Sequence, residues 1–441
     1  MDGQLRRHVL PDWMAAECAE ARARGDWRAA CAAARITVVA RSDADVDAAA
    51  GMLAGLAPEL LRLNLPRSRN GSGVLWPGAR YVLAPDGPVG ADTVVLEVRA
   101  PTWRTSSQRL TLHIARLGDL GAGPVVPLPP YLWDARRTGE RPPALREPPG
   151  AAAWTAAGWH LDDSVEQSFW SRVGADLLDR TDPLLAAHEL RRVAAQFGQA
   201  VWSLRTKHYP RPNPSPGFNW FLRLETAAEQ LRVTWVKDPP PGPYRAELCL
   251  HPALLAASVA APESAPPAVA ERVRVRCRGV WHEIAVRAGR LELLDHTDGE
   301  RPAELTLRDL GGEASACFRI EAAWRAGGKD SELPKSLRRY RRDLWLRIEH
   351  GGSRAVLALL DADLDPHLRD GLGRTLLHHI HQFDHTELLP RLLEADLDVN
   401  TQCRRRWTPM CEVLVHDPPA DLLLALDAAG AHPRLAHRLD R

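Results

Sequence analysis

A 33-residue period in the last quarter of the chain is the feature that most constrains its fold. Thr375 recurs 33 residues later as Thr408. The same spacing relates residues 359–365, with the sequence LLDADLD, to residues 392–398, with the sequence LLEADLD. A fixed period of this size predicts a stack of short helical units that bury their apolar faces against one another. Such arrays generally hold partners on an extended surface and carry out no chemistry themselves.

Residues 370–400 resemble one ankyrin repeat. In that family an Asp-x-x-Gly-x-Thr-Pro-Leu-His segment makes a turn and starts the first helix. This chain has Leu376 where the family has proline, and it matches the other positions at Asp370, Gly373, Thr375, Leu377 and His378. Gly373 supplies the backbone freedom that the turn needs, and the Thr375 hydroxyl can cap the first helix.

Two flanking segments follow in the same phase. The later one keeps Thr408-Pro409-Met410, whereas the earlier one, about 335–368, lacks the Thr-Pro-Leu turn and is typical of an amino-terminal cap. The resemblance therefore implies about two and a half to three repeats over residues 335–433. So short an array cannot bury its faces alone, and we expect its first helix to pack on the preceding domain.

Ankyrin-like proteins present variable partner contacts on their loop tips and inner helices, so the resemblance implies a bound protein partner. Arg405 and Trp407 lie at one expected tip, and Arg and Trp dominate interface energetics. Solvent-exposed arginines without a partner are the alternative interpretation of this tip. The candidate partner-binding residues are Leu372, Arg374, Gln382, Phe383, Arg404, Arg405, Trp407, Val415 and His416.

Composition narrows the remaining classes. The length of 441 residues favours two to four domains. Lys plus Arg (57) nearly balances Asp plus Glu (56), which disfavours non-specific nucleic-acid binding. The seven cysteines form no C-x-x-C pair and are typical of small buried hydrophobes in a reducing compartment. With no leader pattern and no long apolar run, we expect a cytoplasmic protein that does not span a membrane. Scarce lysine and abundant Ala, Pro and Gly indicate a GC-rich bacterial genome.

The first 330 residues are expected to form two α+β modules ahead of the all-α ankyrin array. In residues 1–122, helix signals at 10–34 and 43–65 flank a short strand signal at 36–39 and precede three further strand signals, which predicts an α+β domain of unknown type. Residues 123–152 are rich in Pro, Gly and Arg and are expected to be a linker or an extended wrap.

Residues 153–330 are expected to be an α+β domain with antiparallel strands. An amphipathic helix is predicted over 183–206, and alternating apolar residues over 273–293 predict a β-meander. Residues 56–66 and 129–137 are similar to segments of uncharacterised actinobacterial proteins. Some of those are encoded beside MoxR-type AAA+ ATPases and von Willebrand factor A-domain proteins.

No motif predicts a reaction. His381 and His385 have metal-ligand spacing on a helix, but His378 and His385 fall on histidine positions of the repeat, so a structural role is favoured and no metal site is expected. Asp162 and Asp163 beside a histidine match no known catalytic pattern. The sequence also lacks the lysine of a phosphate loop and a G-x-S-x-G elbow. We therefore expect no catalytic, cofactor-binding or metal-binding residues.

The sequence favours a bacterial adaptor protein, not an enzyme, whose short ankyrin array holds a protein partner. One alternative is an effector or enzyme domain in residues 1–330 that the array targets. The other is an accessory subunit of an AAA+ ATPase and von Willebrand A-domain system. The sequence leaves open the partner, the oligomeric state, the role of residues 1–330 and any small ligand.

Overall fold

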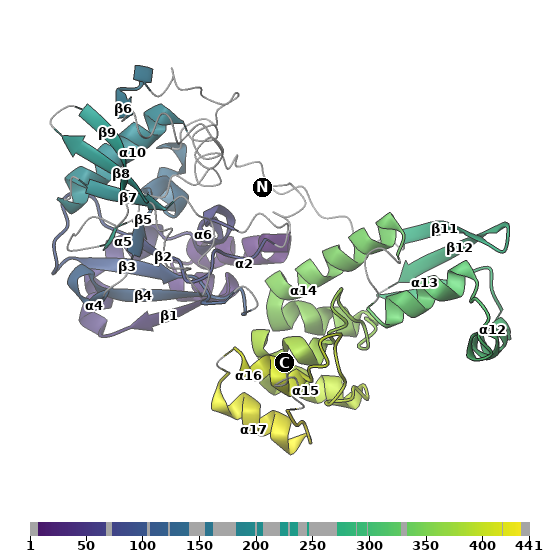
Figure 1. Ribbon diagram of the computed structural model, residues 1–441. Coiled ribbons are helices and arrows are strands. Elements are labelled where there is room, and N and C mark those ends of the chain that lie inside the picture. The colour runs from purple at the N-terminus through teal and green to yellow at the C-terminus, as the bar shows by residue number, and fades with distance from the viewer. Residues whose placement is uncertain are drawn as a thin grey trace, which may run out of the picture. The chain divides into compact units, whose positions relative to one another are not determined.

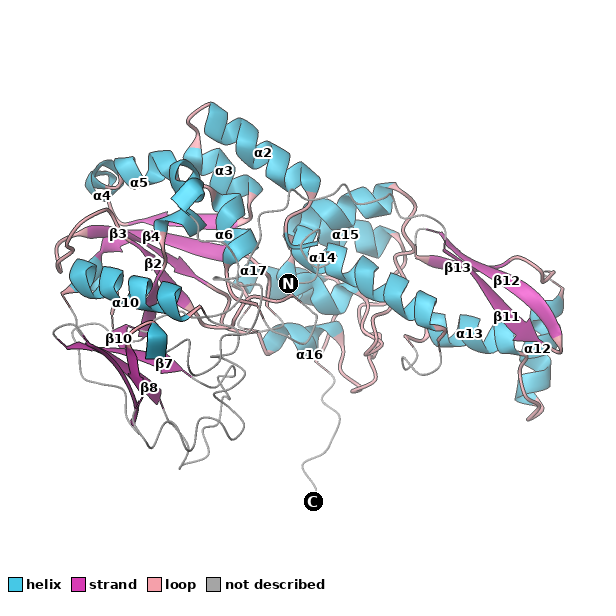
Figure 2. Ribbon diagram, turned by 90° about the horizontal axis from the view of Figure 1, so that it is seen from above, coloured by secondary structure: helices cyan, strands magenta, loops and turns pink. Residues whose placement is uncertain are grey.

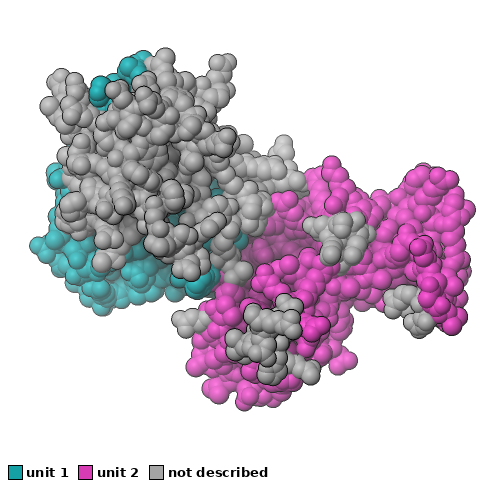
Figure 3. All heavy atoms as spheres, in the orientation of Figure 1, with its two compact units in different colours: residues 1–104, 108–263 teal, residues 105–107, 264–441 magenta. Residues whose placement is uncertain are grey.

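The computed structural model describes most of the chain outside its Pro-rich segments (Figure 1). The described residues are 8–67, 73–103, 106–121, 124–140, 155–161, 182–198, 201–205, 221–227, 230–236, 245–246, 271–287, 289–297, 299–327, 333–416 and 418–433. The chain divides into two compact units (Figure 3): unit 1 comprises residues 1–104 and 108–263, and unit 2 comprises residues 105–107 and 264–441. The residues 153–330 expected as one domain are thus shared between the two units.

Unit 1 contains a six-stranded mixed sheet. In spatial order its strands are β1 (Ile36–Ala40), β4 (Leu110–Arg116), β3 (Val94–Arg99), β2 (Arg80–Leu83), β5 (Pro124–Pro127) and β10 (Arg245–Ala246). Strands β2, β3 and β4 form the antiparallel centre, while parallel pairing adds β1 at one side and β5 with β10 at the other.

Helices cover both faces of this sheet (Figure 2). Side chains alternate along a strand, so Tyr81 and Leu83 pack toward one helical layer and Val82 packs toward the other. The second layer is α10 (Pro183–Phe197). The first layer is made of α2 (Asp12–Ala23), α3 (Trp27–Ala33), α4 (Asp43–Ala48), α5 (Ala50–Gly55) and α6 (Pro58–Asn64).

Two expected helices are shorter than their apolar periodicity indicated. The helix expected over 43–65 is interrupted twice, and Leu56 and Ala57 are extended ahead of Pro58 because a residue before proline is pushed out of helical geometry. The helix expected over 183–206 ends where Gly198 takes a left-handed φ of 62°, a common helix terminator.

A second, four-stranded sheet also belongs to unit 1. Its strands lie in the order β6 (Trp159–Leu161), β9 (Gln230–Val236), β8 (Phe221–Ala227) and β7 (Val201–Arg205). The described part of the expected linker is integral to unit 1. Besides β5 it forms η2 (Pro130–Leu132) and η3 (Ala135–Glu140), and it follows η1 (Leu117–Asp119). Leu132 and Trp133 are buried, so this segment wraps the core.

Unit 2 begins with the expected β-meander and continues as helices and turns. The meander pairs β11 (Glu271–Cys277) with β12 (Val280–Arg287) and β12 with β13 (Arg290–Leu293). The helical elements are α12 (Glu300–Asp309), α13 (Ala316–Arg325), α14 (Lys335–Asp361), η5 (Leu376–Gln382), α15 (His385–Glu394), α16 (Pro409–Leu414) and α17 (Ala420–Ala428).

One apolar core connects the meander to these helices. Ile284 of the sheet, Leu344 of α14 and Leu377 of η5 belong to the same buried cluster. The first helix of the C-terminal region therefore packs on the preceding sheet, as expected above. α14 itself is kinked at Gly352, whose φ of 69° and ψ of −161° are not helical.

Candidate partner-binding face and candidate metal centre

The backbone of unit 2 repeats its local geometry at the 33-residue spacing. Asp363 and Asp396 have φ angles of 63° and 58°. Gly373 and Arg406 have φ angles of 74° and 60°. Residues other than glycine seldom adopt positive φ, so the two consecutive segments share an uncommon backbone turn at these matched positions. The position equivalent to Asp363 and Asp396 in the last segment is Gly430, with a φ of 81°. Gly430 comes 34 residues after Asp396, in keeping with one extra residue in that segment.

Each segment carries a tight loop of the same form. In the first loop the N–H of Asp370 donates to the carbonyl of Arg374 at 2.9 Å. In the second the N–H of Cys403 donates to the carbonyl of Trp407 at 3.0 Å. The Asp370 carboxylate also accepts from the N–H groups of Leu372 and Arg374, each at 2.8 Å. Cys403 offers no such acceptor, yet the main-chain turn is preserved.

A histidine links the two segments. The N–H of Thr375 donates to Nδ1 of His378 at 3.1 Å, which leaves the proton of the neutral ring on Nε2. Nε2 lies 3.1 Å from the carbonyl oxygen of Trp407, to which it donates. Burial lowers the pKa of His378 to about 4, because a charged ring would lose its hydration there.

The loop tips lie side by side and are exposed. The N–H of Arg404 donates to the carbonyl of Leu372 at 3.1 Å, which joins the second tip to the first. Leu372 is 41% exposed, and the Arg405 guanidinium carbon lies 6.0 Å from the centre of the half-buried Trp407 ring. We call Leu372, Arg404, Arg405 and Trp407 the tip surface.

Three predicted contact residues are partly or fully covered inside unit 2. Arg374 Nε lies 2.7 Å from Asp370 Oδ2, and Arg374 Nη1 lies 3.0 Å from Glu412 Oε1. The Arg374 side chain is 14% exposed, whereas Gln382 and Phe383 are buried. Gln382 and Phe383 are therefore removed from the surface that a partner could reach, and Arg374 is half-buried with its guanidinium already paired. Val415 is 55% exposed just after α16, and the half-buried His416 beside it stacks on His381.

The histidines that crowd residues 378–385 have separate roles. His379 Nε2 lies 3.3 Å from Asp370 Oδ2, and burial lowers the pKa of His379. Burial alone would raise the pKa of Asp370, but the hydrogen bond from His379 and the charge of Arg374 hold it well below its usual range. His381 stacks on another ring, and His385 lies 3.8 Å from Asp421. These histidines are therefore accounted for by packing, capping and ion pairing.

Four other side chains do converge. In the part of the chain that the structure describes, Cys277, His282, His296 and Cys317 form the one cluster whose potential metal-ligand atoms all lie within 4.8 Å of one another. Both cysteines are buried, and both histidines are half-buried. Burial raises the pKa of the Cys277 thiol, but hydrogen bonds from Ser315, Cys317 and the N–H of Ala316 outweigh burial and lower it. Burial, with the nearby Cys277, raises the pKa of Cys317 to about 12.

These cysteines were expected to be small buried hydrophobes, and their cluster with two histidines was not predicted from the sequence. One signal was present in the β-meander. Cys277 ends the alternating series on β11, and His282 occupies an inward position of the alternating series Val280 to Val286 on β12. A histidine on the same sheet face as a cysteine, across a tight hairpin, marks two converging ligands. His296 and Cys317 come from a loop and a helix, whose proximity only the tertiary fold decides.

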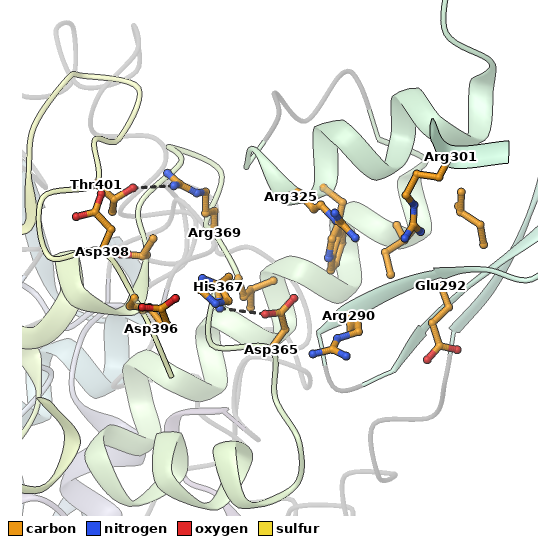
Figure 4. A pocket seen from close by; sticks show the side chains of 16 residues that line it. Arg290, Glu292, Arg301, Arg325, Asp365, His367, Arg369, Asp396, Asp398 and Thr401 are labelled. Atoms are coloured by element: carbon orange, nitrogen blue, oxygen red, sulfur yellow. Dashed lines mark hydrogen bonds between the residues drawn. The ribbon is translucent and has the colours of Figure 1, made fainter. Parts of the chain in front are cut away.

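A polar cleft of about 800 Å³ lies within unit 2, between β13 with α13 and the loops of the helical region (Figure 4). Trp324 and Leu291 contribute its apolar wall. Charges of both signs surround it, from Arg290, Glu292, Arg301, Arg325, Asp365, Arg369, Asp396 and Asp398. Arg369 is already engaged, since Nη2 lies 2.9 Å from Thr401 Oγ1. The cleft lining includes no cysteine or serine nucleophile.

Comparisons of the chain with protein-family models, curated proteins and solved structures gave no match. Among the described residues no helix is both long enough and apolar enough to cross a membrane.

Proposed function

We propose that residues 335–433 are a short ankyrin array that holds a protein partner. Support comes from the matched positive φ angles and from the paired loops that begin at Asp370 and Cys403. His378 adds to this support, since it caps its own helix through Thr375 and donates to the loop of the next segment. Each segment is in this way held by its neighbour, as in stacked-repeat proteins.

The tip surface is the observation that best supports partner binding by the array. A main-chain hydrogen bond joins its two tips, and Leu372, Arg404 and Arg405 are exposed on them. The tip surface combines the apolar Leu372 with Arg405 and Trp407, and Arg and Trp are the residue types that most often contribute strongly to binding energy. Val415 and His416 are flanking candidates, while the buried Gln382 and Phe383 and the half-buried, ion-paired Arg374 maintain the shape of the array.

The decisive experiment compares two Arg–Trp pairs of unit 2. The full-length chain is used to capture proteins from its native host, and the affinity for the captured protein is then measured by calorimetry. We expect Arg405→Ala with Trp407→Ala to weaken binding by about 2–4 kcal/mol, roughly 30- to 1000-fold. The control is Arg274→Ala with Trp281→Ala, which removes a similar pair at 5.9 Å on the meander. Equal binding by both double variants would contradict the assignment of the tip surface.

The same capture separates the alternatives. An AAA+ ATPase that co-purifies stoichiometrically would favour the accessory-subunit interpretation over a free adaptor. A catalytic activity that resides in residues 1–330, found together with a partner bound by the array, would favour a targeted enzyme. A cytoplasmic location is part of the proposal, since the six described cysteines are free and buried, as in proteins of reducing compartments.

A further inference from the structure

The cluster of two cysteines and two histidines is assembled from four separate segments of unit 2. Cys277 is the last residue of β11 and His282 lies near the start of β12. His296 follows β13, and Cys317 is in the first turn of α13. Residues that are up to 40 positions apart in the sequence thus bring their ligand atoms within 4.8 Å of one another.

Each histidine turns one nitrogen toward the cluster. Nδ1 of His282 lies 2.8 Å from Nε2 of His296 and 3.9 Å from Sγ of Cys317. The other nitrogen of His296, Nδ1, lies 3.2 Å from Oε2 of Glu300. Metal-binding histidines commonly donate their second N–H to a carboxylate, which fixes the ring orientation and frees the opposite nitrogen for the metal.

We propose that Cys277, His282, His296 and Cys317 bind one zinc ion. Two thiolates and two imidazoles are a common ligand set of structural zinc sites, whereas calcium and magnesium require oxygen ligands. All four positions are supplied by the protein, which leaves none for a substrate. The site is therefore structural, and Glu300 is a positioning residue that orients His296.

The position of the site explains why a metal would be needed. The turn at Gly289, at one end of the meander, lies against Leu344 and Leu364 of the main core. The opposite end of β12 lacks such cover, since Val280 is 61% exposed and Trp281 is 58% exposed. The buried side chains near that end include Cys277 and Cys317, with the half-buried His282 and His296 beside them. Small structures without enough apolar core commonly depend on a metal in this way.

Metal analysis of the full-length chain tests the proposal. Protein purified without chelators is expected to hold one zinc ion per chain. Exchange with Co²⁺ should give a thiolate-to-cobalt charge-transfer band and the intense visible bands of tetrahedral coordination. Cys277→Ser and Cys317→Ser should each lose the tightly bound ion and these bands. The control Cys403→Ser changes another buried cysteine of unit 2 and should retain both.

A second variant tests the positioning role. Glu300→Gln keeps all four ligands but weakens the acceptor for His296, so zinc affinity measured against a chromophoric chelator should fall about 10- to 100-fold. An unchanged affinity would remove Glu300 from the proposal.

The wild-type protein alone can overturn the metal site, even if the serine variants fail to fold. Less than half an equivalent of metal after dialysis against zinc, with no cobalt–thiolate band, would show that the four side chains form only a hydrogen-bonded cluster. A Cys277–Cys317 disulfide in freshly purified protein, detected by mass spectrometry after alkylation, would also refute zinc binding. Full metal retention by both serine variants would place the ion elsewhere.

Discussion

Replacing His378 with glutamine should change how the stability of unit 2 depends on pH. The ring accepts a hydrogen bond from Thr375 at Nδ1, so a proton added there would face the N–H of Thr375. The side chain is fully buried, and its pKa falls from 6.5 to about 4. Because the unfolded chain binds a proton at His378 more readily than the folded chain, the free energy of unfolding has its full value above pH 6.5 and falls as the pH drops toward 4.

The size of the effect follows from the two pKa values. With 6.5 for the unfolded chain and about 4 for the folded chain, lowering the pH from 7 to 5 should cost about 2 kcal/mol of stability through His378 alone. His379 and His416 also have lowered pKa values, so the total loss in the wild type is larger. The comparison with His378→Gln isolates the contribution of one ring.

Urea unfolding of the full-length chain at pH 7 and at pH 5, followed by tryptophan fluorescence, measures this difference. His378→Gln should be less stable than the wild type at pH 7, because it weakens the links to Thr375 and Trp407. Its disadvantage should shrink by about 2 kcal/mol at pH 5. His367→Gln, at an exposed loop position, is the control for loss of an imidazole. A stability difference that is the same at both pH values would refute the reasoning.

Two further substitutions test the packing of unit 2. Asp370→Asn removes a buried carboxylate charge that is paired with Arg374 and should cost about 3–5 kcal/mol in urea unfolding. Asp361→Asn, in an exposed ion pair, should cost less than about 1 kcal/mol, and similar costs for the two variants would mean that the buried charge is not needed. Gly327→Ala should cost at least about 3 kcal/mol, because its φ is +65° and an added Cβ would lie 2.5 Å from the carbonyl oxygen of Asp370. Gly78→Ala, with a φ of +67° but open space around it, should cost only about 1 kcal/mol, and equal thermal shifts for the two would rule out the close contact as the cause.

Short-range patterns located most of the regular structure. The strand expected over 36–39 is Ile36–Ala40, and the meander expected over 273–293 spans Glu271–Leu293. Alternation and turn residues suffice for the meander because its neighbouring strands are joined by tight hairpins. Two helices were predicted too long, since apolar spacing continues through Leu56 and Leu204 although the backbone has already left the helix.

The candidate sites were predicted less completely. The loop positions of Leu372, Arg404 and Arg405 follow from the period, because each lies at a turn of known form. The burial of Gln382 and the ion pairing of Arg374 do not follow from it, since both depend on which neighbouring element covers the residue. Arg374 is held in place because Glu412, 38 residues later, pairs with its guanidinium.

The sequence by itself determined the 33-residue phase, the turn glycines and caps, and the inward face of the meander, because all of these are set by residues close along the chain. Only the tertiary structure decided that two histidines and two cysteines share one point, and that a polar cleft lies between the meander and the helical loops. The physical reason is that the convergence of distant side chains depends on how whole elements pack. Packing is set by the burial of apolar surface, so the spacing of the four ligand residues along the sequence does not predict that they meet.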